Sequence, residues 1–351
     1  MRRGYLVLED GQAFEGIRFG GEGCPIGELV FTTGMGGYLE TLTDPAFAGQ
    51  IVMQTYPLIG NYGVIGEDLE GQCRLRGYVV REICDSPSNF RTEGDLETFL
   101  KEQGVPGLCG VDTRELTRII REKGVMNATI CDEIPADLEA VKIYKVCEPF
   151  AEKAAEVVPA EGEEKFRVTL VDYGTRRSVI RQLAKRGCTV TVVSGLTSAE
   201  EILAGKPDGV VLSAGAGDPA DCTAQVEEVK KLMGKVPVFG MGLGHQLAAL
   251  SQGAKTCKLK YGRRGGNQPV RDLAGTRTYT TASNHGYAVD SDSVTVGKVR
   301  FANVNDGTCE GIDYPALRAF TVQFQPEGCT DVKGNCFFFD RFIDLMKGGN
   351  Q

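Results

Sequence analysis

The 351-residue sequence has no long apolar run, no excess of basic charge and only two histidines. A helix that spans a bilayer needs about 20 consecutive apolar residues, and no stretch approaches that length. The 39 lysines and arginines are outnumbered by 47 aspartates and glutamates, giving a formal net charge of −8. No diffuse positive field is therefore available to hold a nucleic-acid backbone. We expect a soluble, cytoplasmic protein with no membrane segment and no nucleic-acid partner.

Two further absences restrict the chemistry. The twelve cysteines include no C-x-x-C pair, and Cys329 and Cys336, the nearest pair in the C-terminal part, have no histidine beside them. We expect reduced thiols and no metal site. The sequence also has no G-x-x-x-x-G-K loop for phosphate binding, so we expect no cofactor in this chain.

A change of composition at residues 148–165 divides the chain. The segment EPFAEKAAEVVPAEGEEK carries six glutamates, two lysines and two prolines without apolar periodicity, which is typical of a solvated linker. We expect one domain over residues 1–147 and a second over residues 166–351.

The first part alternates short strand-like runs with turns rich in Gly, Pro and Asn, which predicts a mixed α/β domain with much strand. The expected strands are Tyr5–Leu8, Glu28–Thr32, Gln50–Gln54 and Arg76–Arg81. The expected helices are Gly94–Gln103 and Thr113–Glu122.

The second part alternates apolar strands with amphipathic helices, which predicts a doubly wound parallel sheet. The expected strands are Arg167–Asp172, Thr189–Val193, Gly209–Leu212 and Val236–Phe239. The expected helices are Arg176–Arg186, Ser198–Leu203, Gln225–Met233 and Gln246–Gln252. Ligands of such sheets bind at the carboxyl ends of the strands, so we expect the loops Ser213–Pro219 and Gly240–Gln246 to form the site.

One of these loops has the pattern of a nucleophile elbow. The run PVFGMGLGHQ, residues 237–246, is a buried strand followed by a Gly-x-z-x-Gly turn that opens a helix. In an elbow the middle residue projects into the pocket and the helix start supplies backbone N–H groups. Here the middle residue is Gly242, which has no side chain, so no covalent chemistry can begin from it. Such positions often have strained backbones that glycine tolerates.

With this elbow the sequence resembles the small subunit of carbamoyl phosphate synthetase, a class I glutamine amidotransferase, whose elbow reads G-x-C-x-G-H-Q. The motifs that carry the resemblance in the first part are residues 27–31, 37–38, 42–45, 49–52, 56–57, 59–63, 88–90 and 112–114. Those in the second part are residues 172–174, 217–219, 240–246, 265–267, 284–287 and 323–327. Other class I amidotransferases share only the second part.

The resemblance implies a mechanism whose groups are mostly missing here. In the family a cysteine attacks the glutamine amide, a histidine acts as base and a glutamate orients that histidine. In this sequence Gly242 stands at the cysteine position and Gln325 at the histidine position. Only the orienting acid, Glu327, remains, and we expect no glutaminase activity. The segment 328–336 also departs from the family pattern, beside the missing base.

The resemblance further implies residues that bind L-glutamine, and we expect weak binding to persist. These residues are Ala46, Gly215, Gly217, Leu243, Gln246, Asn284, Gly286 and Tyr287. Ala46 replaces a usual serine, Tyr287 replaces a usual phenylalanine, and the loop S-A-G-A-G replaces S-N-G-P-G.

Other residues are poor substitutes for the missing pair. We interpret His245 as structural and His285 as a supporting loop residue. A hidden nucleophile among Cys222, Cys257 and Cys329 would need a base within about 3 Å, and none of these cysteines lies in a recognisable turn.

Three functions remain open. The first is an inactive small chain that still docks on the large subunit, where ATP and bicarbonate would bind and free ammonia would be used for carbamoyl phosphate synthesis, in arginine and pyrimidine biosynthesis. The second is a glutamine-binding regulatory pseudoenzyme. The third is an active amidotransferase with displaced catalytic groups.

Overall fold

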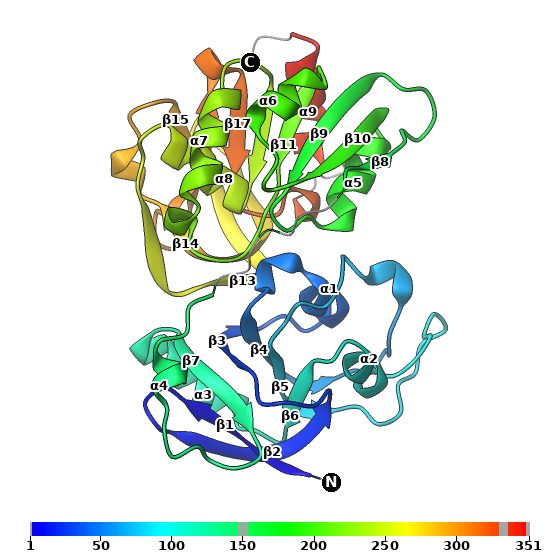
Figure 1. Cartoon of the computed structure of the whole chain (residues 1–351), viewed down its shortest axis with the longest axis vertical. Helices are drawn as coiled ribbons and strands as arrows, with labels where there is room; N and C mark the ends of the chain where they lie inside the picture. Colours follow the sequence, from blue (N-terminus) through cyan, green and yellow to red (C-terminus); the bar gives the residue numbers. More distant parts are fainter. Residues whose placement is uncertain (1, 147–149, 151–153, 330–335, 349–351) are drawn as a thin grey trace. The chain divides into compact units, whose positions relative to one another are not determined.

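The computed structural model describes residues 2–146, 150, 154–329 and 336–348 (Figure 1). The chain forms two compact units. The first holds residues 1–148 together with 260–264, and the second holds residues 149–259 and 265–351. No described helix has the length and apolarity needed to cross a bilayer.

The first unit is built on a closed barrel. Its strands are β1 (Arg3–Leu8), β2 (Ala13–Gly20), β3 (Ile26–Thr32), β4 (Gln50–Ile59), β5 (Gly77–Ile83), β6 (Pro106–Cys109) and β7 (Met126–Cys131). They follow the order β1-β2-β6-β5-β4-β3-β7, and β7 pairs with β1 to close the ring. The pairs β3–β4, β4–β5 and β5–β6 are parallel. Closure leaves no open sheet edge.

Short helices surround this barrel. They are α1 (Tyr38–Thr43), α2 (Leu96–Glu102), α3 (Thr113–Lys123) and α4 (Glu139–Lys142), with the 3-10 turns η1 (Pro45–Phe47) and η2 (Gly66–Asp68). Asp95 caps α2 and Asp112 caps α3 by accepting hydrogen bonds from first-turn N–H groups, as N-cap carboxylates do. The helices and strands predicted in this part are present, but the short apolar runs could not indicate closure into a barrel.

The second unit confirms the predicted parallel sheet and extends it. Its strands are β8 (Glu156–Val158), β9 (Phe166–Asp172), β10 (Cys188–Ser194), β11 (Gly209–Leu212), β12 (Val238–Met241), β13 (Thr256–Asp272), β14 (Thr278–Val289), β15 (Lys298–Asn303), β16 (Cys309–Tyr314) and β17 (Ala319–Val322). The order is β14-β13-β15-β16-β17-β12-β11-β9-β10-β8. The five neighbouring strands β10, β9, β11, β12 and β17 are parallel. β8 pairs antiparallel with β10 on one side of them, and β16 pairs antiparallel with β17 on the other.

Helices cover both faces of this sheet, so its central strands are apolar on both sides. They are α5 (Arg177–Ala184), α6 (Ala199–Ala204), α7 (Thr223–Leu232), α8 (Leu243–Ser251) and α9 (Phe337–Met346), with the 3-10 turns η3 (Pro219–Asp221), η4 (Ser291–Ser293), η5 (Pro315–Leu317) and η6 (Pro326–Gly328). The α5 and α9 side chains pack with Phe239 of β12, whereas α6, α7 and α8 pack with Val238. Successive residues of β12 thus serve opposite layers.

The segment 148–165, predicted as a solvated linker, contains one short strand. Residues 156–158 form β8, which pairs antiparallel with Val190–Val192 of β10. Two of its three residues are exposed, so the edge strand is held by backbone pairing. Amino-acid composition indicates which side chains are buried, but it could not reveal a strand that is held by backbone hydrogen bonds.

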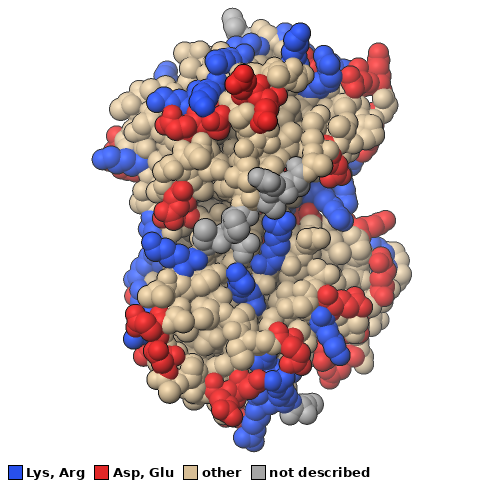
Figure 2. All heavy atoms as spheres, viewed as in Figure 1, with Lys and Arg blue, Asp and Glu red and all other residues tan. Residues whose placement is uncertain are grey.

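Acidic and basic side chains are interspersed on the face drawn in Figure 2. On the face drawn in Figure 2, neither sign covers a whole unit. This distribution matches the mixed charges of the sequence.

We expect Phe239→Ala to lower the free energy of unfolding by about 3–5 kcal/mol, because it empties a buried aromatic site. Phe239 is fully buried, and its ring centroid lies 4.6 Å from that of Phe320. Phe90→Ala is the matched control: Phe90 is 95% exposed, so its truncation should change stability by less than about 0.5 kcal/mol. Urea denaturation of both variants measures the two changes in the free energy of unfolding. Equal decreases would contradict the placement of Phe239 in the core.

Candidate active site

The elbow lies at the carboxyl ends of the parallel strands, as predicted. β12 ends at Met241 and α8 begins at Leu243, so a single residue makes the turn. The Gly242 N–H donates to the Val322 carbonyl at 3.0 Å, and the Gly244 N–H donates to the Ser213 carbonyl at 2.9 Å. These bonds join the elbow to the ends of the two neighbouring strands, β17 and β11.

Gly242 has the backbone conformation of a nucleophile elbow. Its φ is 53° and its ψ is −115°, a region that L side chains rarely adopt. This agrees with the prediction of a strained elbow. A Cβ placed on Gly242 would lie 2.8 Å from the Cβ of Ala214, closer than two carbons pack. The turn is therefore kept, while the space beside it is tight for any side chain.

The retained acid has a different partner from the one its family role implies. Arg176 Nε lies 3.4 Å from Glu327 Oε1, and the two side chains are only 11% and 9% exposed. Arg176 directly precedes α5, in the loop that follows β9. The guanidinium compensates the nearly buried carboxylate, since an unpaired charge there would be costly. Sequence reasoning missed Arg176; its only signal was a basic residue just after a central strand.

Gln325, at the predicted base position, is held by its backbone. It directly precedes η6, and its N–H donates to the Ala282 carbonyl at 2.8 Å. A neutral amide cannot take a proton from a nucleophile at ordinary pH. Of the altered segment 328–336, residues 330–335 lie outside the described part of the chain, while the Cys336 thiol donates to the Glu327 carbonyl at 3.4 Å.

His245 is a structural histidine. It is fully buried in α8, with Nδ1 2.7 Å from the Thr321 hydroxyl. Burial, reinforced by nearby His285, lowers the pKa of His245 to about 3. The imidazole is therefore neutral at pH 7 and enclosed by protein, which supports the structural interpretation.

His285 is also engaged within its own strand. Its Nδ1 lies 2.8 Å from the Tyr287 carbonyl, and a carbonyl only accepts, so Nδ1 carries a proton. This contact fits the predicted supporting role.

The three candidate cysteines differ in environment. Burial raises the pKa of Cys329 to about 12, so that thiol stays protonated and unreactive at pH 7. The Cys222 thiol is half-buried and donates to the Asp218 carbonyl at 3.7 Å. Cys257 is exposed on β13. Neither Cys222 nor Cys257 lies in a turn of the elbow kind.

Part of the predicted glutamine site is brought together around the elbow. Gly215 packs so closely that a Cβ there would lie 2.5 Å from the Tyr173 carbonyl oxygen and 2.8 Å from Leu243 Cδ2. Gly217 has a φ of 97°, which favours glycine. This loop therefore depends on its glycines, and it lies against Leu243.

Gln246 connects α8 to β14, the strand that carries the other predicted contacts. Its Nε2 donates to the Tyr287 carbonyl at 2.8 Å and to Gln323 Oε1 at 2.9 Å. Both amide hydrogens are used, so toward a ligand Gln246 has only its oxygen to offer. Asn284 and Gly286 lie on the same strand as Tyr287, and all three are partly exposed.

Ala46 lies in the first unit, apart in the chain from the other predicted contacts. It is buried within η1, where its N–H donates to Asp44 Oδ1 at 3.0 Å. Its contribution to glutamine binding, like that of the residues around the elbow, stays a prediction.

Comparison with known proteins gives matches to both parts of the chain. The model of the carbamoyl-phosphate synthase small chain, CPSase domain, matches residues 6–130, and that of glutamine amidotransferase class-I matches residues 169–345. The chain is 46% identical to a carbamoyl phosphate synthase small chain of Listeria monocytogenes serotype 4b, covering 100% of this chain and 99% of the relative. It is 46% identical to that of Bacillus cereus strain ATCC 10987, covering 97% and 95%.

We expect Gly242→Ala to destabilise the second unit by about 1–3 kcal/mol, because a side chain at this φ is strained. Part of the loss should come from overlap with Ala214, so Gly242→Ala with Ala214→Gly should be more stable than the sum of the single changes predicts. A double-mutant cycle by urea denaturation should give a coupling of roughly 0.5–3 kcal/mol. Strict additivity would contradict the close approach.

We expect stability to fall at acid pH through His245. Its folded-state pKa of about 3 lies below the ordinary value of 6.5, so the unfolded chain binds the proton first. The stability that the neutral imidazole contributes is complete above about pH 6.5 and is lost as pH falls toward 3. The free energy of unfolding should therefore decrease by about 1 kcal/mol between pH 6 and pH 5. Urea midpoints at both pH values measure it. The His245→Asn variant keeps a hydrogen-bonding amide but should not show this loss of stability between pH 6 and pH 5. If its stability depends on pH as steeply as that of the unaltered chain, His245 is not the cause.

Proposed function

Because the chain belongs to the family of carbamoyl phosphate synthase small chains, we propose that it docks on a large synthase subunit without hydrolysing glutamine. Membership of the family implies the large-subunit partner. The proposal concerns what this chain contributes to the complex. It acts as a scaffold or regulatory subunit, and the large subunit uses free ammonia.

The observation that carries this proposal is the side-chain-free elbow. Glutamine hydrolysis in the family needs a thiolate that attacks the amide carbon, a base that moves the protons, and water that cleaves the resulting thioester. Gly242 offers no atom for the first step, and Gln325 offers no base. Glu327, which would orient the base, faces Arg176. All three positions of the expected triad therefore argue against hydrolysis.

The ATP and bicarbonate steps belong to the partner in this proposal. The chain has no phosphate-binding G-x-x-x-x-G-K loop, so ATP and bicarbonate are assigned to the large subunit. The small chain then contributes by binding and holding the large subunit, in the pathways that lead to arginine and pyrimidines.

Weak glutamine binding is a second candidate function, favoured by the packing of the Gly215 loop against Leu243. The family resemblance implies that a ligand there would meet backbone N–H groups and Gln246, but this chain offers it no nucleophile. Binding without turnover would make the chain a glutamine sensor. Calorimetry with L-glutamine tests this. Saturable binding with a Kd of roughly 10 μM to several mM supports a sensor. The absence of binding heat supports the scaffold function without glutamine binding. A covalent adduct in mass spectrometry would indicate a displaced active site.

We expect the complex of this chain with its large subunit to make carbamoyl phosphate from ammonium but not from glutamine. Glutamine-dependent synthesis should be lower than ammonium-dependent synthesis by roughly 10³-fold or more, since loss of a nucleophile alone costs such enzymes that much. Ammonium is the internal control, because it requires the same complex and the same ATP chemistry. Comparable rates with both nitrogen sources would refute the proposal, and so would failure of the two chains to associate.

A further inference from the structure

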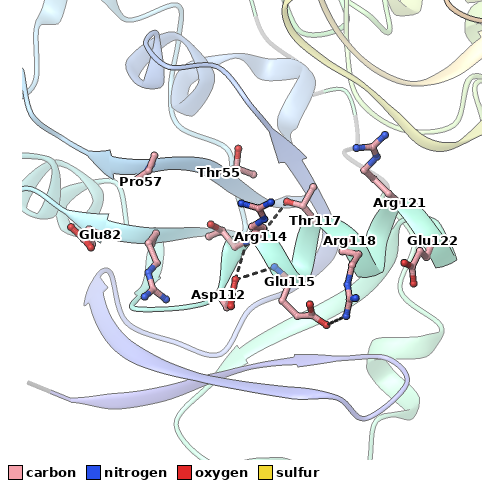
Figure 3. A pocket seen from close by; sticks show the side chains of 12 residues that line it. Thr55, Pro57, Glu82, Asp112, Arg114, Glu115, Thr117, Arg118, Arg121 and Glu122 are labelled. Atoms are coloured by element: carbon pink, nitrogen blue, oxygen red, sulfur yellow. Dashed lines mark hydrogen bonds and ion pairs between the residues drawn. The ribbon is translucent and has the colours of Figure 1, made fainter.

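The first unit contains a groove that the glutamine chemistry does not use. It has a volume of about 1250 Å³ and lies between β4, the end of β5 and helix α3 (Figure 3). Small-molecule pockets usually enclose about 300–1,000 Å³, so this open groove is large enough for a segment of polypeptide. Two motifs of the family resemblance, residues 56–57 and 112–114, reach it through Pro57 and through Asp112, Thr113 and Arg114.

A bulge in β4 shapes one wall of the groove. Gln54 pairs with Val80 and Leu58 pairs with Glu82, so residues 55–57 lie opposite the single residue Arg81. A bulge of this kind redirects side chains and often lies beside a functional site. Here it brings Thr55 and Pro57 to the groove together with Arg81.

The other wall is α3, which presents a row of arginines. Arg114, Arg118 and Arg121 are spaced by four and three residues and therefore share one face of the helix. Arg118 turns back to Glu115, with Nη2 2.7 Å from Oε1. The Arg118 pKa is raised by this hydrogen bond, and Glu122 adds to the effect. The charge of Arg118 is therefore satisfied within the helix.

Three other arginines of the groove lack such a partner. Within the described part of the chain, no carboxylate forms an ion pair with Arg81, Arg114 or Arg121. Arg114 lies in the first turn of α3, where the helix dipole disfavours a cation. The N–H groups of Arg114 and Glu115 already donate to Asp112 Oδ1. An incoming anion would thus be bound by guanidinium groups, with the helix end already capped.

We propose that this groove binds a carboxylate-bearing segment of the large synthase subunit, with Arg81 and Arg114 as its main contacts. The proposal rests on the proposed function, since it names the surface through which that association occurs. The groove also carries Glu82 and Glu122, which would repel the continuous charge of a nucleic acid. Guanidinium groups bind carboxylates through paired hydrogen bonds, so a protein segment with spaced acidic residues fits the mixed charge.

The test measures the affinity of the full-length chain for the large subunit by calorimetry at two salt concentrations. Arg114→Gln and Arg81→Gln should each raise Kd by at least fivefold, and the double variant by more than either, with a weaker salt dependence. Arg118→Gln is the matched control, from the same groove and helix, and should change Kd by less than twofold. Unchanged melting temperatures show that the variants are folded.

The outcomes separate this inference from the proposed function. If the unaltered chain does not bind the large subunit, both fail. If it binds and the Arg81 and Arg114 variants bind equally well, only the groove assignment is wrong. An effect of Arg118→Gln as large as that of Arg114→Gln would also overturn it. So would Arg114-dependent binding of inorganic phosphate together with an unchanged Kd for the large subunit, since that result would assign the groove to a small anion.

Discussion

A turn of one residue between β12 and α8 is the constraint on which the site depends. The strand ends at Met241 and the helix begins at Leu243, so Gly242 alone redirects the chain, at a φ of 53°. The geometry is maintained by hydrogen bonds to the ends of β11 and β17. Since these contacts use backbone atoms, the elbow persists without the side chain that it would serve in catalysis. Glycine at this position relieves a strain that a nucleophile would impose.

The family resemblance places Gly242 and Gln325 at the nucleophile and base positions, which changes the electrostatics expected for Glu327. A carboxylate oriented toward a histidine is balanced by the imidazolium that forms during catalysis. If Gln325 stands at the histidine position, as the resemblance implies, no imidazolium forms beside the nearly buried Glu327 carboxylate. The Arg176 guanidinium, 3.4 Å away, supplies the compensation. The retained glutamate is thus explained by its ion pair and does not by itself indicate catalysis.

The two units divide the properties of the chain. The second has the elbow, the Gly215 loop and the buried histidine, all at the carboxyl ends of parallel strands. The first has a closed barrel whose bulged strand β4 and helix α3 border a charged groove. The predicted nucleophile and base positions of the second unit are Gly242 and Gln325. In the first unit, no described carboxylate forms an ion pair with Arg81, Arg114 or Arg121 of the groove. Under the proposed function, the chain binds another macromolecule and does not hydrolyse glutamine.

Local patterns in the sequence determined most elements, the parallel sheet and an elbow whose middle residue is glycine, because apolar periodicity and turn residues are encoded in contiguous stretches. The role of Gln325 came from resemblance to a family. Tertiary structure alone decided the closure of the barrel, the pairing of β8, the Arg176–Glu327 ion pair and the use of both Gln246 amide hydrogens. Each of these joins residues from separate elements. Such contacts depend on how strands and loops meet in space, which no short stretch of sequence specifies.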